Sequence, residues 1–420
     1  MQITLPWPHP GQCRVLRERR RFNVLSAGRR WRKTTGGLSR VIPVVLDGGQ
    51  ALWGAPVYDQ VMTAYDELAR ATHGVFKPNK TDRSFLSPTG GRIILRSLDD
   101  PDNARSKTAH IVVLDEAGDC HPDAWKKVIR PMLMDTLGEA WIIGTPKGRN
   151  WFWEAYRDAT DPDKPRPNWA AWQIPSLGVE VTSAGLIRKP HPYENTDLTF
   201  SELVDMYEEM TEQNFRQEVL AEFIEDAGGV FRGVTKCATA PALPREPYEG
   251  SFVIGVDWGK SHDFTVLTCL DTRSKEVVDH DRFNKIDWEF QRARLEAMYL
   301  KWNSHRHGSV QIVAEQNSIG DVLIEALRKS KLPVHAFDTN NLSKQTIIED
   351  LSLAIERQTI SYPPIVPVLN ELQAYQMVRR PSGLMTYSAP PGDKNYDDCV
   401  ISLALAYHAV KHNPDPSRWK

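Results

Sequence analysis

Short apolar runs, bounded by polar or glycine-rich segments, recur along the first half of the chain. Four of them fit buried strands, at residues 22–25, 93–95, 111–114 and 141–143. Such continuous runs are typical of parallel strands, which are covered on both faces. A long helix is expected from about residue 201 to 223, with Thr199 as N-cap and Gly228-Gly229 at its end. The pattern predicts an α/β domain with a mostly parallel sheet.

The second half of the chain shows a different succession of apolar runs. Strands are expected at residues 252–256, 265–270 and 310–314, and helices near residues 288–302, 319–329, 344–356 and 399–410. A Pro-rich stretch at residues 239–247 separates the halves, because proline cannot continue a helix or a central strand. We therefore expect two α/β domains of different fold. They would span residues 1–238, including a helical lid at about 195–238, and residues 251–420, with residues 239–250 as linker.

Composition narrows the class of protein. The 420 residues are 41% hydrophobic and 25% charged, as in folded globular proteins. Lys and Arg number 52 against 54 Asp and Glu, a balance of −2, so any binding of nucleic acid must use local grooves and not a general basic coat. The five cysteines are far apart and form no C-x-x-C pair, so neither a disulfide framework nor a structural zinc site is expected. No apolar run is long enough for a membrane span or a signal peptide, so we expect neither.

A basic turn follows the first strand, in Gly28-Arg29-Arg30-Trp31-Arg32-Lys33-Thr34. A phosphate-binding loop needs a tight turn, a lysine for the β- and γ-phosphates, and a hydroxyl for Mg²⁺ at a helix start. Lys33 and Thr34 meet the last two requirements, whereas Ala27 and Arg32 stand where glycine is usual. A basic surface turn before a helix is the alternative interpretation.

Two adjacent carboxylates, Asp115 and Glu116, end the apolar run at residues 111–114. At a strand end, one carboxylate can hold Mg²⁺ while its neighbour polarises an attacking water, as in ATP hydrolysis. The alternative is that both only cap the next helix. The run at residues 141–143 leads into Gly144-Thr145-Pro146, a polar turn that would lie beside the γ-phosphate.

Acidic residues also end elements of the second half. Asp257 and Glu315 end two predicted strands, and Asp397 and Asp398 begin the last helix. Carboxylates converging from several elements are what two divalent ions need for phosphodiester cleavage. Taken singly, Asp257 fits a turn, and Asp397 or Asp398 fits a helix cap. Lys344, at a helix start, is a further candidate for contact with a scissile phosphate.

These motifs together resemble the large subunit of tailed-phage terminases, an ATP-driven DNA-packaging motor joined to an RNase H-like nuclease. The resemblance covers nearly the whole chain, and the order of the motifs is more specific than any one of them. The matching segments are Pro10-Gly11-Gln12, residues 28–34, Val113 to Ala117, Ile143 to Pro146, Phe215 to Phe223, Gly255 to Gly259, and Asp397-Asp398 before Leu403 to Ala406. The family implies an N-terminal P-loop (ASCE-type) ATPase domain and a C-terminal RNase H-like α/β nuclease domain.

The resemblance also implies residue roles. In the ATPase, Gln12 would read adenine, Lys33 and Arg30 would face phosphate, Thr34 and Asp115 would hold Mg²⁺, Glu116 would activate water, and Thr145 would lie in the coupling motif. Arg105 falls where the family often places an arginine finger acting on a neighbouring subunit, although Arg29, Arg30 and Arg32 offer other cations. In the nuclease, Asp257, Glu315 and Asp398 would bind the metal, with Asp397 a second candidate for the third position.

ATP and Mg²⁺, with Mn²⁺ as an alternative in the nuclease, are the cofactors that the family implies. Its partners would be double-stranded DNA, a portal protein, a terminase small subunit and further copies of the chain in a ring of about five. The place of action would be the host cytoplasm and the portal vertex of the procapsid. Two other interpretations stay open, a helicase-nuclease of DNA repair and a DNA-binding protein with impaired sites. Arg32, where the family commonly has glycine, keeps the second one open.

Overall fold

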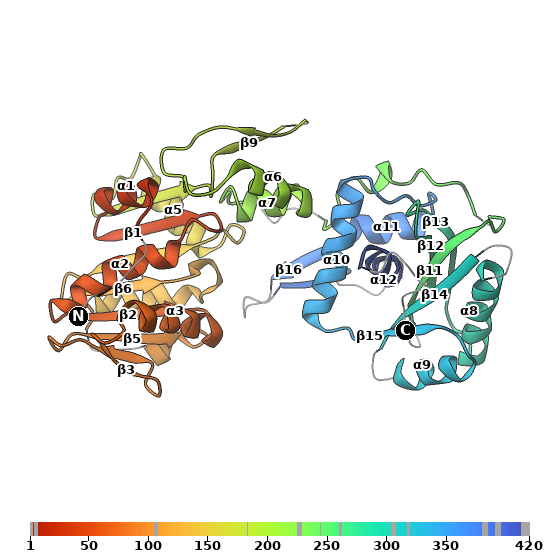
Figure 1. Ribbon diagram of the computed structural model, residues 1–420, viewed down its shortest axis with the longest axis horizontal. Coiled ribbons are helices and arrows are strands. Elements are labelled where there is room, and N and C mark those ends of the chain that lie inside the picture. Colours follow the sequence, from red (N-terminus) through yellow and green to blue (C-terminus); the bar gives the residue numbers. More distant parts are fainter. Residues whose placement is uncertain are drawn as a thin grey trace. The chain divides into compact units, whose positions relative to one another are not determined.

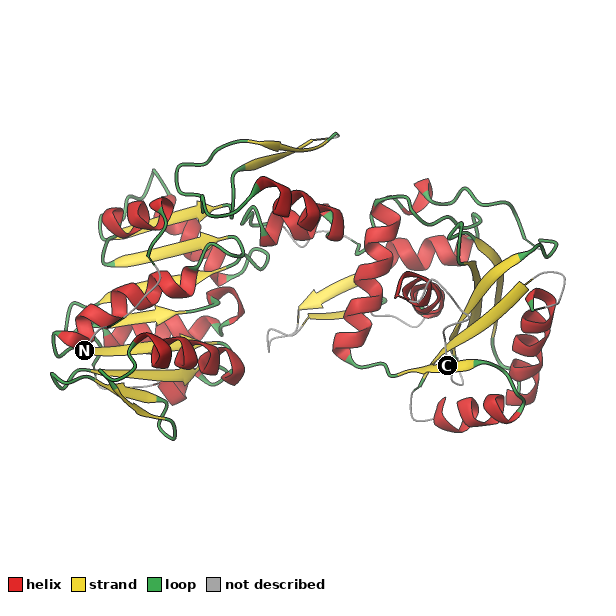
Figure 2. Ribbon diagram, in the orientation of Figure 1, coloured by secondary structure: helices red, strands yellow, loops and turns green. Residues whose placement is uncertain are grey.

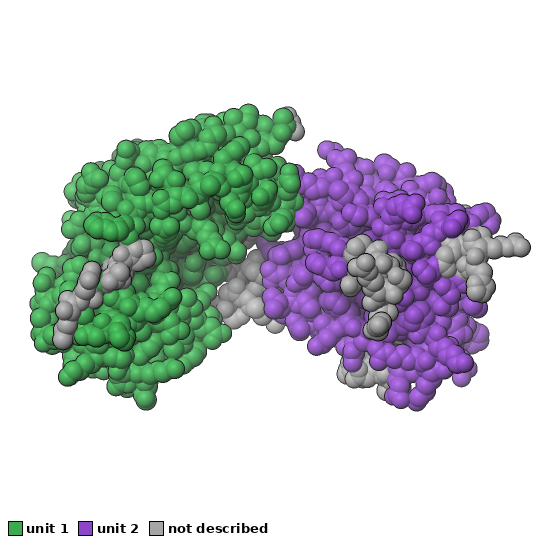
Figure 3. Space-filling model, in the orientation of Figure 1, with its two compact units in different colours: residues 1–226 green, residues 227–420 purple. Residues whose placement is uncertain are grey.

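The chain forms two compact units, Met1–Asp226 and Ala227–Lys420 (Figure 3). The computed structural model describes residues 3, 7–104, 108–182, 184–224, 229–243, 245–259, 263–303, 308–316, 320–379, 385–390 and 396–412.

Unit 1 is a mostly parallel sheet with helices on both faces (Figures 1 and 2). Its strands are β1 (Phe22–Ala27), β2 (Gln50–Ala55), β3 (Lys77–Asn79), β4 (Ser84–Leu86), β5 (Arg92–Ser97), β6 (Ile111–Leu114), β7 (Glu139–Gly144), β8 (Trp169–Ile174), β9 (Val179–Thr182) and β10 (Gly185–Arg188). Its helices are α1 (Pro10–Glu18), α2 (Lys33–Leu46), α3 (Tyr58–Ala71), α4 (Arg130–Met132), α5 (Trp151–Thr160), α6 (Phe200–Glu209) and α7 (Glu212–Glu218), with short turns η1 (Pro101–Ala104), η2 (Ala117–Asp119) and η3 (Ala124–Ile129). Within the described residues the main sheet has the order β3-β4-β5-β2-β6-β7-β1-β8, antiparallel only from β3 to β5.

Successive residues of the central strands belong alternately to two separate hydrophobic cores, one on each face of the sheet. Leu25 and Val113 pack with the apolar faces of α1, α2 and α3. Their neighbours Val24 and Val112 pack on the opposite side, with η3 and α5. Because both faces are covered, the strands are apolar without alternation, which is why the sequence revealed them.

The four strands predicted in unit 1 are confirmed as parts of β1, β5, β6 and β7. The single long helix predicted from residue 201 to 223 is wrong. Thr199 caps α6 as expected, but the backbone is extended at Met210, and the Thr211 side chain caps a second helix, α7. The last helical residue of this segment is Glu218, so the predicted ending at Gly228-Gly229 is also wrong; Gly228 lies outside the described residues.

Unit 2 is a mixed sheet between two groups of helices (Figures 1 and 2). Its strands are β11 (Gly250–Asp257), β12 (Thr265–Asp271), β13 (Val277–Phe283), β14 (Gly308–Glu315), β15 (Val334–Phe337), β16 (Gln376–Arg379) and β17 (Met385–Ser388). Its helices are α8 (Trp288–Trp302), α9 (Gly320–Lys329), α10 (Asn341–Glu356), α11 (Val366–Ala374) and α12 (Asp398–His412), with a short turn η4 (Val234–Lys236). The described strands of the main sheet run in the order β13-β12-β11-β14-β15, with β11, β14 and β15 parallel and β12 antiparallel to its neighbours.

The last helix, α12, packs directly across the central strand β11. It is buried along nearly its whole length, between β11, α10 and α11. Gly255 permits this approach, because a Cβ atom there would overlap the backbone of Ser402 and Ala406. The Ser402 hydroxyl donates to the Gly255 carbonyl at 2.9 Å, which fixes the helix along the strand.

The first residues of unit 2 precede the Pro-rich stretch expected as the linker. Phe231, Val234 and Cys237 belong to the core shared by α10, α11 and α12. The Tyr362 hydroxyl donates to the Val234 carbonyl at 2.8 Å, and the Ala240 amide donates to the Tyr362 carbonyl at 3.2 Å. These contacts attach residues 231–240 to the second unit. In the part of the chain that the structure describes, no helix is both long and apolar enough to cross a membrane.

Candidate phosphate and metal sites

The loop after β1 ends at the first turn of α2, where Lys33 and Thr34 lie. The buried Lys33 amine donates to the Ala27 carbonyl at 2.8 Å and to the Thr145 hydroxyl at 3.0 Å. Thr34 donates to Asp115 Oδ2 at 3.2 Å. The start of a helix adds backbone N–H groups and a positive dipole end, so this corner of the sheet favours an anion.

Arg32 adopts the backbone conformation that the usual glycine would supply. Its φ of 64° and ψ of 43° lie in the left-handed region, and Arg30 also has a φ of 64°. The Arg32 guanidinium forms an ion pair with Asp197 at 3.0 Å. The loop therefore keeps a glycine-like path at this position, at a conformational cost of about 1–2 kcal/mol.

Because of this strain, we expect the usual order of stability, in which an alanine variant is more stable than a glycine variant, to be reversed at position 32. We expect Arg32→Gly to be more stable than Arg32→Ala by about 1 kcal/mol, because both lose the half-exposed ion pair and only alanine keeps the left-handed strain. Urea unfolding of the full chain measures the difference. The same two substitutions at Arg40, inside α2, should show the opposite order, with the alanine variant more stable than the glycine variant by about 1 kcal/mol. Equal stabilities of the two Arg32 variants would contradict the strain.

Gln12 connects α1 to the same loop. Its Nε2 donates to the Arg32 carbonyl at 2.8 Å, and its Oε1 accepts from the His9 amide at 3.1 Å. His9 in turn accepts from the Gln12 amide through Nδ1 and contacts Trp31 edge to face. The Gln12 amide keeps a second N–H on Nε2 and a second lone pair on Oε1, which the role expected for it, reading adenine, would use.

Asp115 and Glu116 follow β6, and Thr145 follows β7, which lies between β6 and β1. The Thr145 amide donates to Glu116 Oε2 at 3.4 Å, so Thr145 contacts both Glu116 and Lys33. Burial, with the neighbouring Glu116, raises the pKa of Asp115 to about 7, although Lys33 opposes the shift. Burial lowers the pKa of Lys33, against the attraction of both carboxylates. A bound cation would favour the charged carboxylates, so its binding would release protons.

One predicted residue, Arg30, stands apart from this connected set. The Arg30 side chain is exposed, and its carbonyl accepts from Asn195 at 2.9 Å. Arg105 lies outside the described residues.

Glu218 is a residue of this region for which no role was predicted from the sequence. Its carboxylate contacts Arg29 at 2.7 Å and Lys147 at 2.6 Å, and these cations hold its pKa below the usual range despite burial. The Arg29 amide also donates to the Glu218 carbonyl at 2.7 Å. Glu218 thus ties the end of α7 to the loop after β1 and to the turn after Thr145.

Unit 2 brings together the carboxylates predicted from its strand ends. Asp257 and Glu315 end the adjacent parallel strands β11 and β14, and Asp398 begins α12, which packs on β11. Burial and the negative charges of Glu315 and Asp398 raise the pKa of Asp257 well above its usual value. Burial is also the main reason that the pKa of Asp398 rises to about 7. Three carboxyl groups are therefore held close together against their repulsion.

The two neighbouring aspartates at the start of α12 differ in their surroundings. Asp398 is buried and accepts from the Phe264 amide at 3.2 Å. Asp397 is less buried and forms an ion pair with Lys344 at 3.2 Å. Lys344 thus lies beside the carboxylates, as a residue that contacts a nearby phosphate would.

The donor set fits divalent cations. Carboxylate oxygens are the ligands that Mg²⁺ and Mn²⁺ prefer, and the hydrogen bond between Asp257 and Glu315 requires a proton that a cation would replace. The buried Tyr375 hydroxyl has no hydrogen-bond partner among the described residues. The nearby charges of Asp397, Asp257 and Glu315 add to burial in raising its pKa. Water held by a bound cation would satisfy such a hydroxyl.

A second set of contacts fixes the start of α12 and was missed from the sequence. Glu371 accepts from the Cys399 amide at 2.7 Å and forms an ion pair with Arg282 at 3.0 Å. The Arg282 guanidinium lies 3.4 Å from the centre of the Phe264 ring. Glu371 thus holds the first turn of α12, and with it Asp398. No local sequence pattern predicts these contacts.

Fold and sites together define the class. The chain joins an N-terminal domain with the P-loop (ASCE-type) fold to a C-terminal domain with the RNase H-like fold and clustered carboxylates. In the first domain β7 lies between β1, which precedes Lys33, and β6, which precedes Asp115.

Comparisons with known proteins identify the relatives. No family model matches the chain. It is 29% identical to the terminase large subunit of Thermus virus P23-45 and 27% identical to that of Thermus phage G20c, each over 95% of this chain and 87% of the relative. The solved structure of the large terminase from another thermophilic bacteriophage shares the fold, with a TM-score of 0.58 and 13% identity over 97% of this chain and all of that one. The resemblance predicted from the motifs is confirmed: the chain is similar to phage terminase large subunits over nearly its whole length.

Proposed function

We propose that this chain hydrolyses ATP to drive double-stranded DNA into a procapsid and cuts concatemeric DNA when packaging begins and ends. The observation that carries the proposal is the presence on one chain of both sets, Lys33 with Thr145 and Glu116 in unit 1, and Asp257 with Glu315 and Asp398 in unit 2. Its relatives over 95% of the chain are terminase large subunits.

In the ATPase, we assign the roles from the contacts around the loop. Lys33 exchanges its bonds to Ala27 and Thr145 for bonds to the β- and γ-phosphates, and Thr34 with Asp115 holds Mg²⁺. Glu116 orients the attacking water and accepts its proton. The large terminase that shares the fold has also been solved in complex with ADP, which supports nucleotide binding at this fold. Arg105 or Arg30 would supply the positive charge that stabilises the transition state.

In the nuclease, Asp257, Glu315 and Asp398 would hold two Mg²⁺ or Mn²⁺ ions, with Asp397 beside them. Bound there, the cations would activate a water and stabilise the charge on the scissile phosphate. Lys344, paired with Asp397, can turn to the phosphate of the bound strand. Duplex DNA, the portal protein, a small subunit and further copies in a ring of about five are the proposed partners, in the host cytoplasm and at the portal vertex.

The experiment that tests this function measures three activities of the full chain. We expect ATP hydrolysis, Mn²⁺-dependent cutting of supercoiled plasmid, and no separation of a labelled duplex into single strands. Strand separation driven by ATP would instead favour a repair helicase-nuclease. Duplex binding with neither hydrolysis nor cutting would favour a DNA-binding protein with impaired sites.

A further inference from the structure

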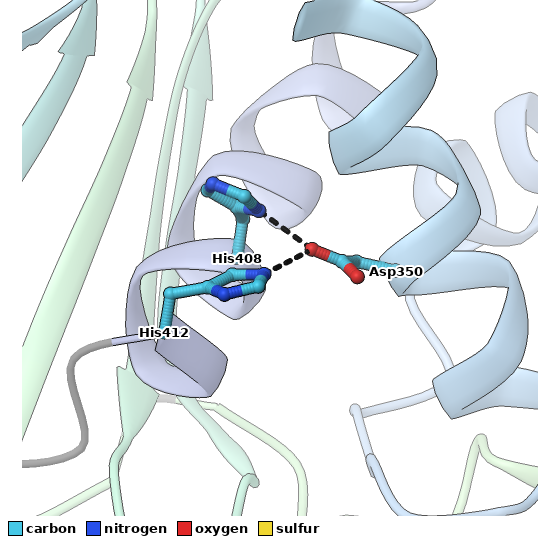
Figure 4. A group of neighbouring side chains, drawn as sticks. All are labelled: Asp350, His408 and His412. Carbon is cyan, nitrogen blue, oxygen red and sulfur yellow. Dashed lines mark hydrogen bonds and ion pairs between the residues drawn. The ribbon is translucent and has the colours of Figure 1, made fainter. Parts of the chain in front are cut away.

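Three potential metal ligands converge at the far end of α12 from Asp398 (Figure 4). Asp350 extends from α10 toward α12 and faces two imidazole rings of the last helical turns. Its Oδ2 atom lies 2.6 Å from His408 Nδ1 and 2.9 Å from His412 Nε2. His408 is ten residues along the helix from Asp398, or about 15 Å, so this cluster is separate from the carboxylates at the helix start.

The spacing and the chemistry of the cluster fit a transition metal. Histidines four residues apart lie on one face of a helix, which is the spacing of the two zinc-binding histidines in H-E-x-x-H. Two imidazoles and one carboxylate form a common ligand set for Zn²⁺. The three ligand atoms all lie within 4.8 Å of one another. At metal–ligand distances of about 2.0–2.2 Å, ligand atoms of a tetrahedral site are about 3.4 Å apart, so the distances from Oδ2 to the two nitrogens need to lengthen by less than about 1 Å.

The surroundings of the cluster support ligation. Lys411 donates to Asp350 Oδ1 at 2.5 Å and leaves Oδ2 to the imidazoles. Ligating carboxylates are usually held in this way by a second partner. The His408 ring packs edge to face on Phe337, which fixes its orientation, whereas the His412 side chain is half exposed and leaves an entry path. The Lys411 ion pair alone balances the Asp350 charge, so charge neutralisation does not explain two converging imidazoles.

We propose that Asp350, His408 and His412 bind one Zn²⁺ ion, or a similar transition-metal ion, with water as the fourth ligand. The ion links the last turn of α12 to the middle of α10. Because it binds the folded chain, it stabilises unit 2 against unfolding. The cysteine pattern, which argued against a zinc site, does not bear on a site made of imidazole and carboxylate.

Co²⁺ and Zn²⁺ binding to the full chain test the proposal. Four-coordinate Co²⁺ with nitrogen ligands absorbs visible light much more strongly than six-coordinate Co²⁺ bound by carboxylates and water. We expect the strong band in the wild type and in Asp257→Ala, and its loss in His408→Gln and His412→Gln. Zn²⁺, added in competition, should abolish the band, and its affinity should fall at least about tenfold in each histidine variant.

Lys411→Gln separates a metal site from an ion-pair cluster, because it removes a charge but no ligand. We expect this variant to keep the strong Co²⁺ band, since glutamine can still donate to Asp350 Oδ1. Loss of the band in Lys411→Gln would overturn the proposal, as would equal Zn²⁺ binding by the wild type and His412→Gln. His412 is half exposed, so His412→Gln should fold even if His408→Gln does not, and circular dichroism verifies this. Mg²⁺-dependent plasmid cutting should be unchanged in the histidine variants, which distinguishes this site from the proposed nuclease.

Discussion

Replacing Glu116 by glutamine should lower the rate of ATP hydrolysis by about two to four orders of magnitude, the usual contribution of a general base. Glutamine keeps the size of the side chain and can still accept the Thr145 amide, but it cannot take a proton from water. Because Lys33, Thr34 and Asp115 are untouched, the KM for ATP should change little. Steady-state phosphate release by the full chain measures both constants.

The same preparation provides the control. Mn²⁺-dependent plasmid cutting by Glu116→Gln should match the wild type, since Glu116 belongs to unit 1. Glu139→Gln is the matched variant, because Glu139 begins β7 and pairs with Arg40. It should keep its ATP turnover. Wild-type turnover in Glu116→Gln would remove this residue from the mechanism.

Replacing Asp257 by asparagine should reduce Mn²⁺-dependent plasmid cutting by at least about two orders of magnitude. Asp257 is buried and close enough to Glu315 and Asp398 to be affected by both charges, so the set would lose a ligand that the other carboxylates do not replace. ATP hydrolysis should not change. Asp281→Asn is the matched control, because Asp281, on β13, pairs with Arg294, on α8, and the loss of this pair should leave cutting intact.

Asp257→Asn should also be no less stable than the wild type when metal is removed. A carboxyl group whose pKa is raised on folding destabilises the folded state as the pH rises through its folded-state pKa. At pH 7.5 in chelator, asparagine removes that penalty, so the melting temperature should stay equal or rise. Lost cutting together with a lower melting temperature would point to damaged packing and not to a lost metal ligand.

The sequence predicted the parts of the fold that burial dictates. Strands covered on both faces, such as β1, β6 and β11, appear as apolar runs, and α8 was predicted with its correct bounds, Trp288–Trp302. β2 and β8 were not predicted. Gly54 interrupts the apolar run of β2, and the two tryptophans of β8 fit core residues of any element. The end of α6 before Thr211 was not predicted, because the apolar periodicity of the segment continues past this second capping residue.

The proximity of the candidate site residues followed from a simple rule. Parallel strands end at the same edge of a sheet, so Asp257 and Glu315 were expected to lie together. Contacts such as that of Arg29 with Glu218, 189 residues apart, depend on how the chain returns to the loop. No local pattern encodes them, and the same holds for the contact between Arg282 and Glu371.

The close approach of α12 to Gly255 limits how this chain can change over evolutionary time. The helix is about 22 Å long, with Asp398 at one end and the Asp350–His408–His412 cluster at the other. A one-residue slip along β11 would rotate every side chain of α12 by about 100° and displace both ends together. A side chain at position 255 would overlap the backbone of Ser402 and Ala406 and so would displace α12 from β11. Substitution of Gly255 would therefore disturb two distant clusters at once, whereas exposed positions of neighbouring helices can vary freely.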